Sequence, residues 1–244
     1  MNEAMAVKSE MTEVRSMRRT AAKVGALYII GTAAGCCSII AKPFLDDPDY
    51  VGKVAGNATP VIIGALFILT MGIALAMMSV LLYPVLRKHN PALAIGYVVF
   101  RGALETSALT ITAFCWLISA ALGRAAAQTG ADPAALIAVS RALTDPRAGN
   151  AITTVFFILG AIMFYSVLYR AKLVPRWISA WGLISAIPYI LSGMLVLFGA
   201  IESGSDAECL LVMPMALQEI VLAIWLIAKG FNTQSQMIPQ AAIA

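Results

Sequence analysis

Long runs of apolar residues alternate with short polar segments along this chain. A run of about 18 or more apolar residues with few charges is typical of a helix that crosses a membrane. Six runs meet this description, at residues 24–44, 60–86, 91–123, 151–169, 177–200 and 209–228. The pattern predicts an all-α polytopic membrane protein, folded as a bundle of six transmembrane helices.

The polar segments divide the chain into three predicted parts. Residues 1–20 form a polar N-terminal segment that we expect in the cytoplasm, and residues 21–230 form the transmembrane domain. Residues 231–244 form a polar tail that we expect to be disordered. The charge-bearing runs at 91–123 and 209–228 do not match in sequence, so the chain does not predict the inverted repeats found in many transporters.

One further helix is expected outside the bilayer. The longest segment between two spans, 124–150, contains Asp132 followed by Pro133. An acidic N-cap with proline at the first helical position is typical of a helix start. The helix that begins here, to about Leu143, is too short to cross a membrane. We therefore expect a short interfacial helix on the extracytoplasmic side.

The distribution of Lys and Arg predicts the orientation of the spans. Cytoplasmic loops of membrane proteins carry an excess of these residues. With the N-terminus in the cytoplasm, 11 of the 17 Lys and Arg residues fall in cytoplasmic segments and 5 in extracytoplasmic ones, while Arg101 lies inside a span. We therefore expect both termini in the cytoplasm.

Composition agrees with the membrane class and excludes another. Hydrophobic residues make up 60% of the chain and charged residues 12%, and the mean hydropathy is +0.85. Soluble domains have about 25% charged residues. A nucleic-acid-binding protein needs a basic face on a soluble surface, which this sequence lacks. We expect the lipid bilayer as a partner and no nucleic acid.

Residues that commonly hold metals and cofactors are scarce. The four cysteines, Cys36, Cys37, Cys115 and Cys209, form no CxxC motif and show no Cys/His spacing suited to a metal. His89 is the only histidine, which excludes a multi-histidine metal centre, a bis-histidine haem and a Ser-His-Asp triad. We expect no metal and no cofactor, and an enzyme of this sequence would rely on carboxylates alone.

Three ionisable residues lie within the predicted spans: Arg101, Glu105 and Glu219. A charge at membrane depth costs from about 2.5 to more than about 10 kcal/mol, so it needs a partner or water. Arg101 and Glu105 are four residues apart and share one helix face. Arg101 and Glu219 each lie about 15 Å from the cytoplasmic end of their spans by helix rise. An in-helix pair and a cross-helix pair are both open, provided that the third and sixth spans meet.

Two interpretations of these residues remain open. Two carboxylates facing one guanidinium leave one acid over, which is expected to take up a proton in a low-dielectric site. The three residues would then line a binding pocket or a proton pathway. In the alternative, Arg101 only ties the third and sixth helices together, because buried charges are usually paired.

Two prolines predict kinks in the last two spans. Pro188 and Pro214 each remove a backbone hydrogen bond from the helix interior. Pro214 is five residues from Glu219, so a kink there would open space close to the charged residues. Gln218 precedes Glu219 on a different helix face, and we assign it no role.

Five stretches of the chain resemble a family of bacterial membrane proteins. They are AAKVGALYIIG at 21–31, FRGALE at 100–105, FF-x-L-G at 156–160, YRAKLVPRWISAWG at 169–182 and PMALQEIVLAIWLIAKG at 214–230. The most distinctive pieces are R-x-x-x-E and E-x-x-x-x-x-W-L-x-x-K-G. The chain resembles, over about residues 18–231, the family catalogued as domain of unknown function 4386.

The resemblance implies a polytopic protein of the bacterial inner membrane. It implies that Arg101, Glu105 and Glu219 occupy the family's usual charged positions, and it implies no activity. The chain departs from the family pattern in its polar N-terminal extension and in its C-terminal tail, so these two segments carry no implication about shared function.

Three functions are compatible with the sequence. The leading hypothesis is a membrane protein that binds or transports a small molecule or a proton at Arg101, Glu105 and Glu219. The second is a structural or accessory subunit that contacts a membrane protein partner through its lipid-facing surface. The third is an intramembrane enzyme that acts on lipid.

Overall fold

The structure is a computed structural model and describes residues 2–45, 47, 49–129 and 133–232. These residues form helices joined by short turns and contain no strand. The elements are α1 (Asn2–Ser38), η1 (Ile39–Ala41), α2 (Lys42–Leu45), α3 (Tyr50–Gly56), α4 (Thr59–Leu86), α5 (Pro91–Tyr97), η2 (Val98–Glu105), α6 (Thr106–Thr129), α7 (Pro133–Thr144), α8 (Pro146–Arg170), α9 (Arg176–Leu197) and α10 (Asp206–Ala228).

Six helical runs in the described part of the chain are long and apolar enough to cross a membrane. They are Val14–Leu45, Thr59–Leu86, Pro91–Ala126, Ala134–Arg170, Arg176–Leu197 and Asp206–Ala228. Large apolar side chains such as Val80, Ile111 and Ile187 are exposed on the outside of the bundle, which suits a surface that faces lipid. The predicted all-α, multi-pass membrane protein is confirmed, whereas the cytoplasmic placement of its termini stays a prediction.

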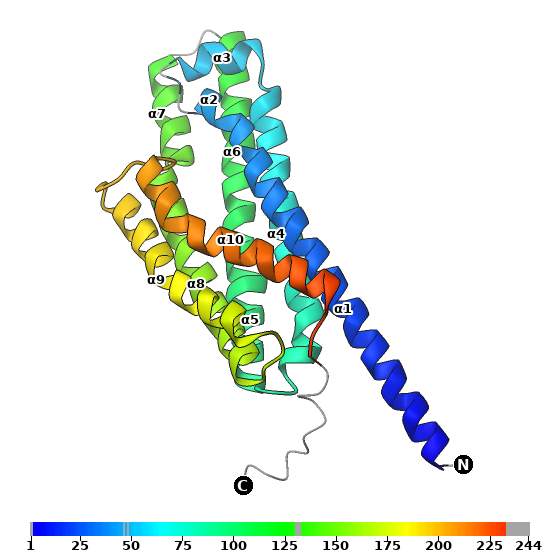
Figure 1. The fold of residues 1–244 in the computed structure, drawn as a ribbon. Coiled ribbons are helices and arrows are strands. Elements are labelled where there is room, and N and C mark those ends of the chain that lie inside the picture. Colours follow the sequence, from blue (N-terminus) through cyan, green and yellow to red (C-terminus); the bar gives the residue numbers. More distant parts are fainter. Residues whose placement is uncertain (1, 46, 48, 130–132, 233–244) are drawn as a thin grey trace.

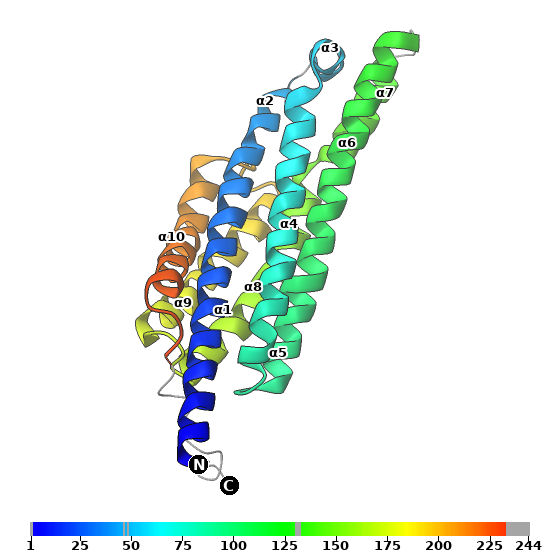
Figure 2. The ribbon, with the colours of Figure 1, turned by 90° about the vertical axis from the view of Figure 1, so that its right-hand side faces the viewer.

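The six spans form a ring. Along it, α6 packs against α4, α4 against α1, α1 against α10, α10 against α9, and α9 against α8. The ring closes where α8 packs against α5 and η2. Figures 1 and 2 show α10 crossing the bundle on the side away from α5 and α6. The third and sixth spans therefore face each other across the interior.

Polar caps begin the two spans that carry the predicted charges. Asn90 Oδ1 accepts a hydrogen bond from the backbone N–H of Leu93 at 3.0 Å, just before α5 starts at Pro91. Ser205 Oγ accepts one from the N–H of Glu208 at 3.3 Å at the start of α10. Such caps stabilise a helix by about 1 kcal/mol, because they satisfy a donor that has no partner within the helix.

Two hydrophobic clusters hold the bundle together. The larger one gathers residues of α1, α4, α5, α8, α9 and α10, with Tyr97, Phe164 and Tyr165 among its most buried members. The smaller one joins α3, α4 and α6 around Tyr50 and Val54. The 36 residues of the third run are about 54 Å long by helix rise. Because the hydrocarbon core is about 30 Å thick, an end of this run stands outside it.

The short helix predicted between the third and fourth spans is present as α7, although the fourth apolar run of the structure, Ala134–Arg170, includes it together with α8. It begins at Pro133 and ends at Thr144, close to the predicted end at Leu143. The proposed N-cap, Asp132, lies outside the described residues. α7 packs against α6 and α3 at the end of the bundle away from α5 (Figure 1). Its placement at the extracytoplasmic interface stays a prediction.

Both ends of the described chain are more regular than the polar composition suggested. The residues of the predicted N-terminal segment are helical from Asn2 onward and continue without a break into the first span. At the other end, Phe231 is buried, and the N–H of Asn232 donates to the carbonyl of Leu173 at 2.8 Å. These two residues begin the predicted tail, and residues 233–244 lie outside the described part.

Candidate functional site

The charged residues predicted within the spans meet in one place. Arg101 Nη1 donates to both carboxylate oxygens of Glu105, at 3.2 and 3.1 Å, and Nη2 donates to Glu219 Oε1 at 2.9 Å. The side chains of Arg101 and Glu105 are 5% and 3% exposed, and that of Glu219 is 16% exposed. The in-helix pair and the cross-helix pair are thus formed together. We call these three residues the charged cluster.

The cross-helix pair bridges the centre of the ring. Arg101 lies on η2 and Glu219 lies on α10, 118 residues later. Among the described helices, η2 and α10 are not one of the closely packed pairs. The two spans therefore meet as the cross-helix pair requires, but through two long side chains rather than through packed backbones.

Arg101 and Glu105 lie on an uncommon stretch of backbone. Residues Val98–Glu105 are π-helical, between the α-helical segments α5 and α6. π-helical turns are rare, and they occur frequently at functional sites. The sequence analysis assumed a regular α-helix here. This assumption was wrong, because the change of hydrogen-bond register has no signature in the residue types of the segment.

Two glycines let neighbouring helices approach the backbone of η2. A Cβ at Gly160 of α8 would lie 3.0 Å from the Cβ of Arg101 and 3.1 Å from its backbone nitrogen. A Cβ at Gly102 would lie 2.8 Å from the Cβ of Ser79 on α4. Small residues at contacts of this kind are typical of packed membrane helices. They hold the backbone that carries Arg101 between α4 and α8.

Aromatic side chains surround the guanidinium. Arg101 Cζ lies 4.3 Å from the ring centroid of Phe157, which in turn packs at 4.6 Å against the ring of Tyr189. A desolvated cation–π contact stabilises by about 2 kcal/mol. Three buried tyrosines, Tyr28, Tyr97 and Tyr165, belong to the same hydrophobic core as Phe157, and Tyr189 packs against that core. Aromatic rings from α1, α5, α8 and α9 therefore share the bundle interior with the charged cluster.

Gln218 belongs to this interior, although the sequence analysis gave it no role. The residue is fully buried. Its Oε1 accepts a hydrogen bond from the hydroxyl of Tyr165 at 2.7 Å, and its Nε2 donates to the carbonyl of Ile178 at 3.1 Å. Gln218 thus links α10 to α8 and α9 beside Glu219. The available signal was an amide next to a carboxylate in an otherwise apolar span.

The two prolines singled out in the sequence lie inside the fifth and sixth spans, as predicted. Pro188 is inside α9 and Pro214 is inside α10, and both helices continue through them. Pro84, inside α4, is a third proline of this kind that the sequence analysis did not single out. The kinks expected at Pro188 and Pro214 stay predictions.

Three of the cysteines and the single histidine lie outside the charged cluster. Cys36, Cys37 and Cys209 are exposed. His89 lies in the turn between α4 and α5, where burial lowers the pKa of its imidazole, with a further lowering from Lys88. Within the described ranges, no group of three or more His, Cys, Asp or Glu residues is placed to hold a metal ion.

The chemistry open to the charged cluster follows from its charges. Two ionised carboxylates and one guanidinium sum to one negative charge. An uncompensated charge in a bundle interior costs several kcal/mol. One added proton would make the charged cluster neutral. The geometry is therefore suited to binding and releasing a proton.

This fold and this charged cluster define a multi-pass, all-α membrane protein with a buried arginine–carboxylate network. The model of a family described as a domain of unknown function, DUF4386, matches residues 24–230. The chain belongs to this family, as its sequence stretches indicated. Comparison with curated proteins finds no match, and comparison with solved structures finds none.

Proposed function

We propose that this membrane protein binds a proton at the charged cluster, and that Glu219 gains and loses it. The observation that carries the proposal is the charge count. Arg101 bonds Glu105 and Glu219 at the same time, so one carboxylate is in excess. In the interior of a membrane protein, ionisable residues commonly mark ion pathways and proton relays.

Glu219 is the better proton acceptor of the two glutamates by its contacts. Glu105 accepts two hydrogen bonds from Arg101 and its side chain is 3% exposed. Glu219 accepts one, and its second oxygen accepts none from the described residues, while its side chain is 16% exposed. A proton on Glu219 therefore displaces fewer hydrogen bonds than a proton on Glu105 does.

Proton exchange of this kind supports the binding or transport of a small molecule in the bacterial inner membrane. The charged cluster lies at the centre of the ring, between spans that face each other. Pro214 lies on α10, five residues before Glu219. A change of protonation at Glu219 would alter the attraction between η2 and α10, and hence how these two elements pack across the ring.

Infrared spectroscopy of the protein in lipid nanodiscs tests the proposal, because protonated carboxyl groups absorb apart from carboxylates. We expect one buried carboxyl band that changes with pH in the wild type. Glu219→Gln should remove this band, whereas Glu202→Gln, a change at an exposed loop acid, should leave it. Absence of such a band in the wild type would overturn the proposal, and its loss only in Glu105→Gln would move the proton to Glu105.

A structural role is the second candidate, and the full bonding of Arg101 favours it. The guanidinium makes three hydrogen bonds, contacts Phe157 and is almost completely buried. A residue held in this way is suited to tying α10 to the bundle. Under this alternative, Glu219→Gln lowers the melting temperature equally at every pH and changes no titrating band. An accessory subunit would in addition co-purify with a stoichiometric membrane protein.

A further inference from the structure

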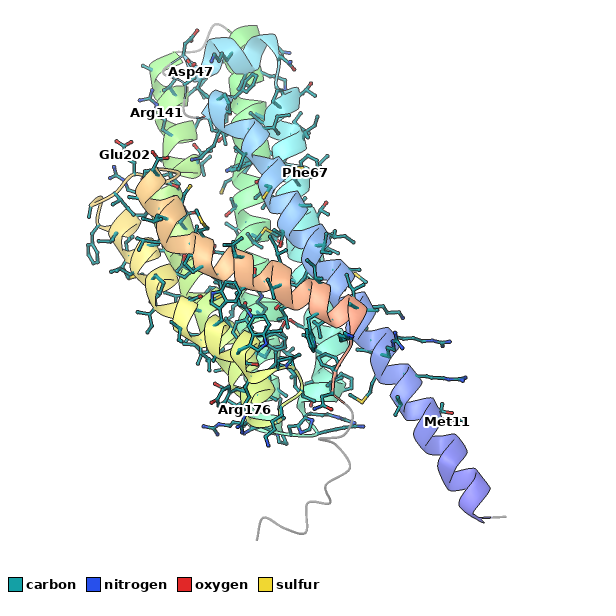
Figure 3. All side chains as sticks on the ribbon, viewed as in Figure 1. Met11, Asp47, Phe67, Arg141, Arg176 and Glu202 are labelled. Atoms are coloured by element: carbon teal, nitrogen blue, oxygen red, sulfur yellow. The ribbon has the colours of Figure 1, made fainter. Side chains whose placement is uncertain are left out.

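A hollow of about 400 Å³ opens where the turn between α8 and α9 meets the end of α10. It lies at the end of the molecule that holds Arg176, far from Asp47, Arg141 and Glu202 (Figure 3). Residues of three kinds line it, cationic, aromatic and amide, and they include Lys172, Arg176, Lys229, Trp225, Phe231 and Asn232. We call it the basic hollow.

The cations of the basic hollow have no counter-charge in the described structure. None of its lining residues is acidic. Lys172, Arg176 and Lys229 form no ion pair with a carboxylate of the described chain. The Cζ atom of Arg176 lies 5.3 Å from the ring centroid of Tyr169. All three side chains are exposed, so their mutual repulsion is weak, and an anion at this concave surface would be attracted by all three.

The backbone of the basic hollow is held in place from both sides. Lys172 has a φ of 51°, a left-handed conformation that side chains other than glycine rarely adopt. A glycine would relieve the turn, but it would also remove the ammonium group. On the other side, Gly230 has a φ of 75° and the N–H of Asn232 bonds to Leu173 at 2.8 Å. The cations are thus carried on fixed backbone rather than on a loose tail.

The remaining lining gives the hollow an apolar floor at the level expected for lipid headgroups. Phe231 is buried and Trp225 is half-buried. Outside the lining, Trp177 and Trp181 stack at the start of α9, with ring centroids 6.4 Å apart. Such aromatic residues are enriched at the membrane–water interface. The apolar floor and the cationic rim of the basic hollow together suit a ligand with an anionic phosphate group and an apolar body.

We infer that the basic hollow binds the phosphate group of an anionic lipid such as phosphatidylglycerol, through Lys172, Arg176 and Lys229. Basic pockets between transmembrane helices on the cytoplasmic side are typical sites for anionic lipid headgroups. The hollow lies at the end that the Lys and Arg distribution predicts to be cytoplasmic. The inference is independent of the proton site, because no residue of the charged cluster lines the hollow.

Native mass spectrometry of the full chain tests the site, with phosphatidylglycerol and phosphatidylcholine added in separate titrations. We expect retained phosphatidylglycerol and little phosphatidylcholine. The double change Lys172→Gln and Lys229→Gln should weaken phosphatidylglycerol binding by about 25-fold, since each basic residue near an anionic surface contributes about fivefold. The charge-keeping pair Lys172→Arg and Lys229→Arg should bind as the wild type does.

The matched control removes two charges elsewhere on the same predicted face. The control is the double change Arg15→Gln and Arg19→Gln, at two exposed positions on α1. It should leave the affinity for phosphatidylglycerol within about twofold of the wild-type value. Equal losses in the two double variants would show attraction by general surface charge and overturn the site. Equal binding of both lipids would overturn it as well.

Soluble competitors separate a lipid from a free phosphate compound. Inorganic phosphate and glycerol 3-phosphate are added to the complex with phosphatidylglycerol. If neither displaces the lipid, the apolar floor is part of the recognition and the ligand is a lipid. If either displaces it from the wild type, recognition rests on the phosphate group alone, and a soluble phosphate compound rather than a lipid is the ligand.

Discussion

The charged cluster and the basic hollow use the same residue types in opposite ways. Arg101 is buried, bonded to two carboxylates and covered by Phe157. Lys172 and Lys229 are exposed and pair with no carboxylate of the described chain. In the interior a charge needs a partner, because burying an unpaired charge is costly. At the end of the bundle the exposed ammonium groups can interact with an anion outside the chain. The interior therefore suits the proposed exchange of a proton, and the end of the bundle suits the proposed binding of an anion.

The largest effect is expected from removing the guanidinium of the charged cluster. Arg101→Met leaves two carboxylates facing each other without a cation, which should lower the free energy of unfolding by about 3–5 kcal/mol. Arg176→Met removes the same group from the basic hollow and should cost less than about 1 kcal/mol. Unfolding in mixed detergent micelles measures both. Equal losses would remove the distinction between the two regions.

A second test acts on the space around Arg101 rather than on its charge. In Gly160→Ala, the new methyl group meets the Cβ and backbone of Arg101, and such overpacking costs about 1–3 kcal/mol. Gly56→Ala is the matched control, since a Cβ there meets nothing within 4 Å. Micelle unfolding should separate the two variants. A neutral Gly160→Ala would show that η2 moves freely and that its position is not fixed by α8.

A smaller effect is expected at the polar contact beside Glu219. Tyr165→Phe removes the hydroxyl that donates to Gln218, which should cost about 1 kcal/mol. Tyr169→Phe, at an exposed position on the same helix, should change stability by a few tenths of a kcal/mol at most. The difference between their unfolding midpoints measures the contact. If Tyr169→Phe were the more harmful change, the buried link between α8 and α10 would be unimportant.

The smallest effect concerns pH at the basic end of the molecule. Burial lowers the pKa of His89 in the folded protein. As the pH falls, His89 is therefore protonated in the unfolded chain at a higher pH than in the folded protein. The stability that the neutral imidazole contributes is fully present above about pH 6.5 and is lost as the pH drops below this value. His89→Gln should remove that part of the fall in melting temperature between about pH 7 and pH 5. If the melting temperatures of the wild type and of His89→Gln fell by the same amount over this pH range, His89 would not be the group responsible.

Features that depend only on hydropathy along the chain and on the rise per residue of a helix could be predicted from the sequence. The six spans follow from the lengths of the apolar runs. The pairing of Arg101 with Glu105 follows from their spacing, and its pairing with Glu219 follows from equal depth in two spans. The spans and the in-helix pair need no knowledge of which helices are neighbours, whereas the cross-helix pair was one of two open pairs and required that the third and sixth spans meet.

Features that depend on helix tilt and neighbour order could not be predicted. Phe157 and Gly160 contact Arg101 because α8 packs on η2. Gln218 and Glu219 both reach the interior because α10 crosses the ring, so two adjacent residues, about 100° apart on a helix, face inward together. Apolar side chains occur on every face of these spans, and the sequence does not mark the faces that meet.

The separation of Arg101 from Glu219 also has a consequence for biogenesis. The third span enters the bilayer with Glu105 as the local partner of Arg101, four residues away. The sixth span is synthesised 118 residues later and brings a carboxylate with no cation of its own. Its insertion is favourable once the guanidinium is already in the membrane to receive it. The packing of the last helix therefore depends on a third span that is already in the membrane.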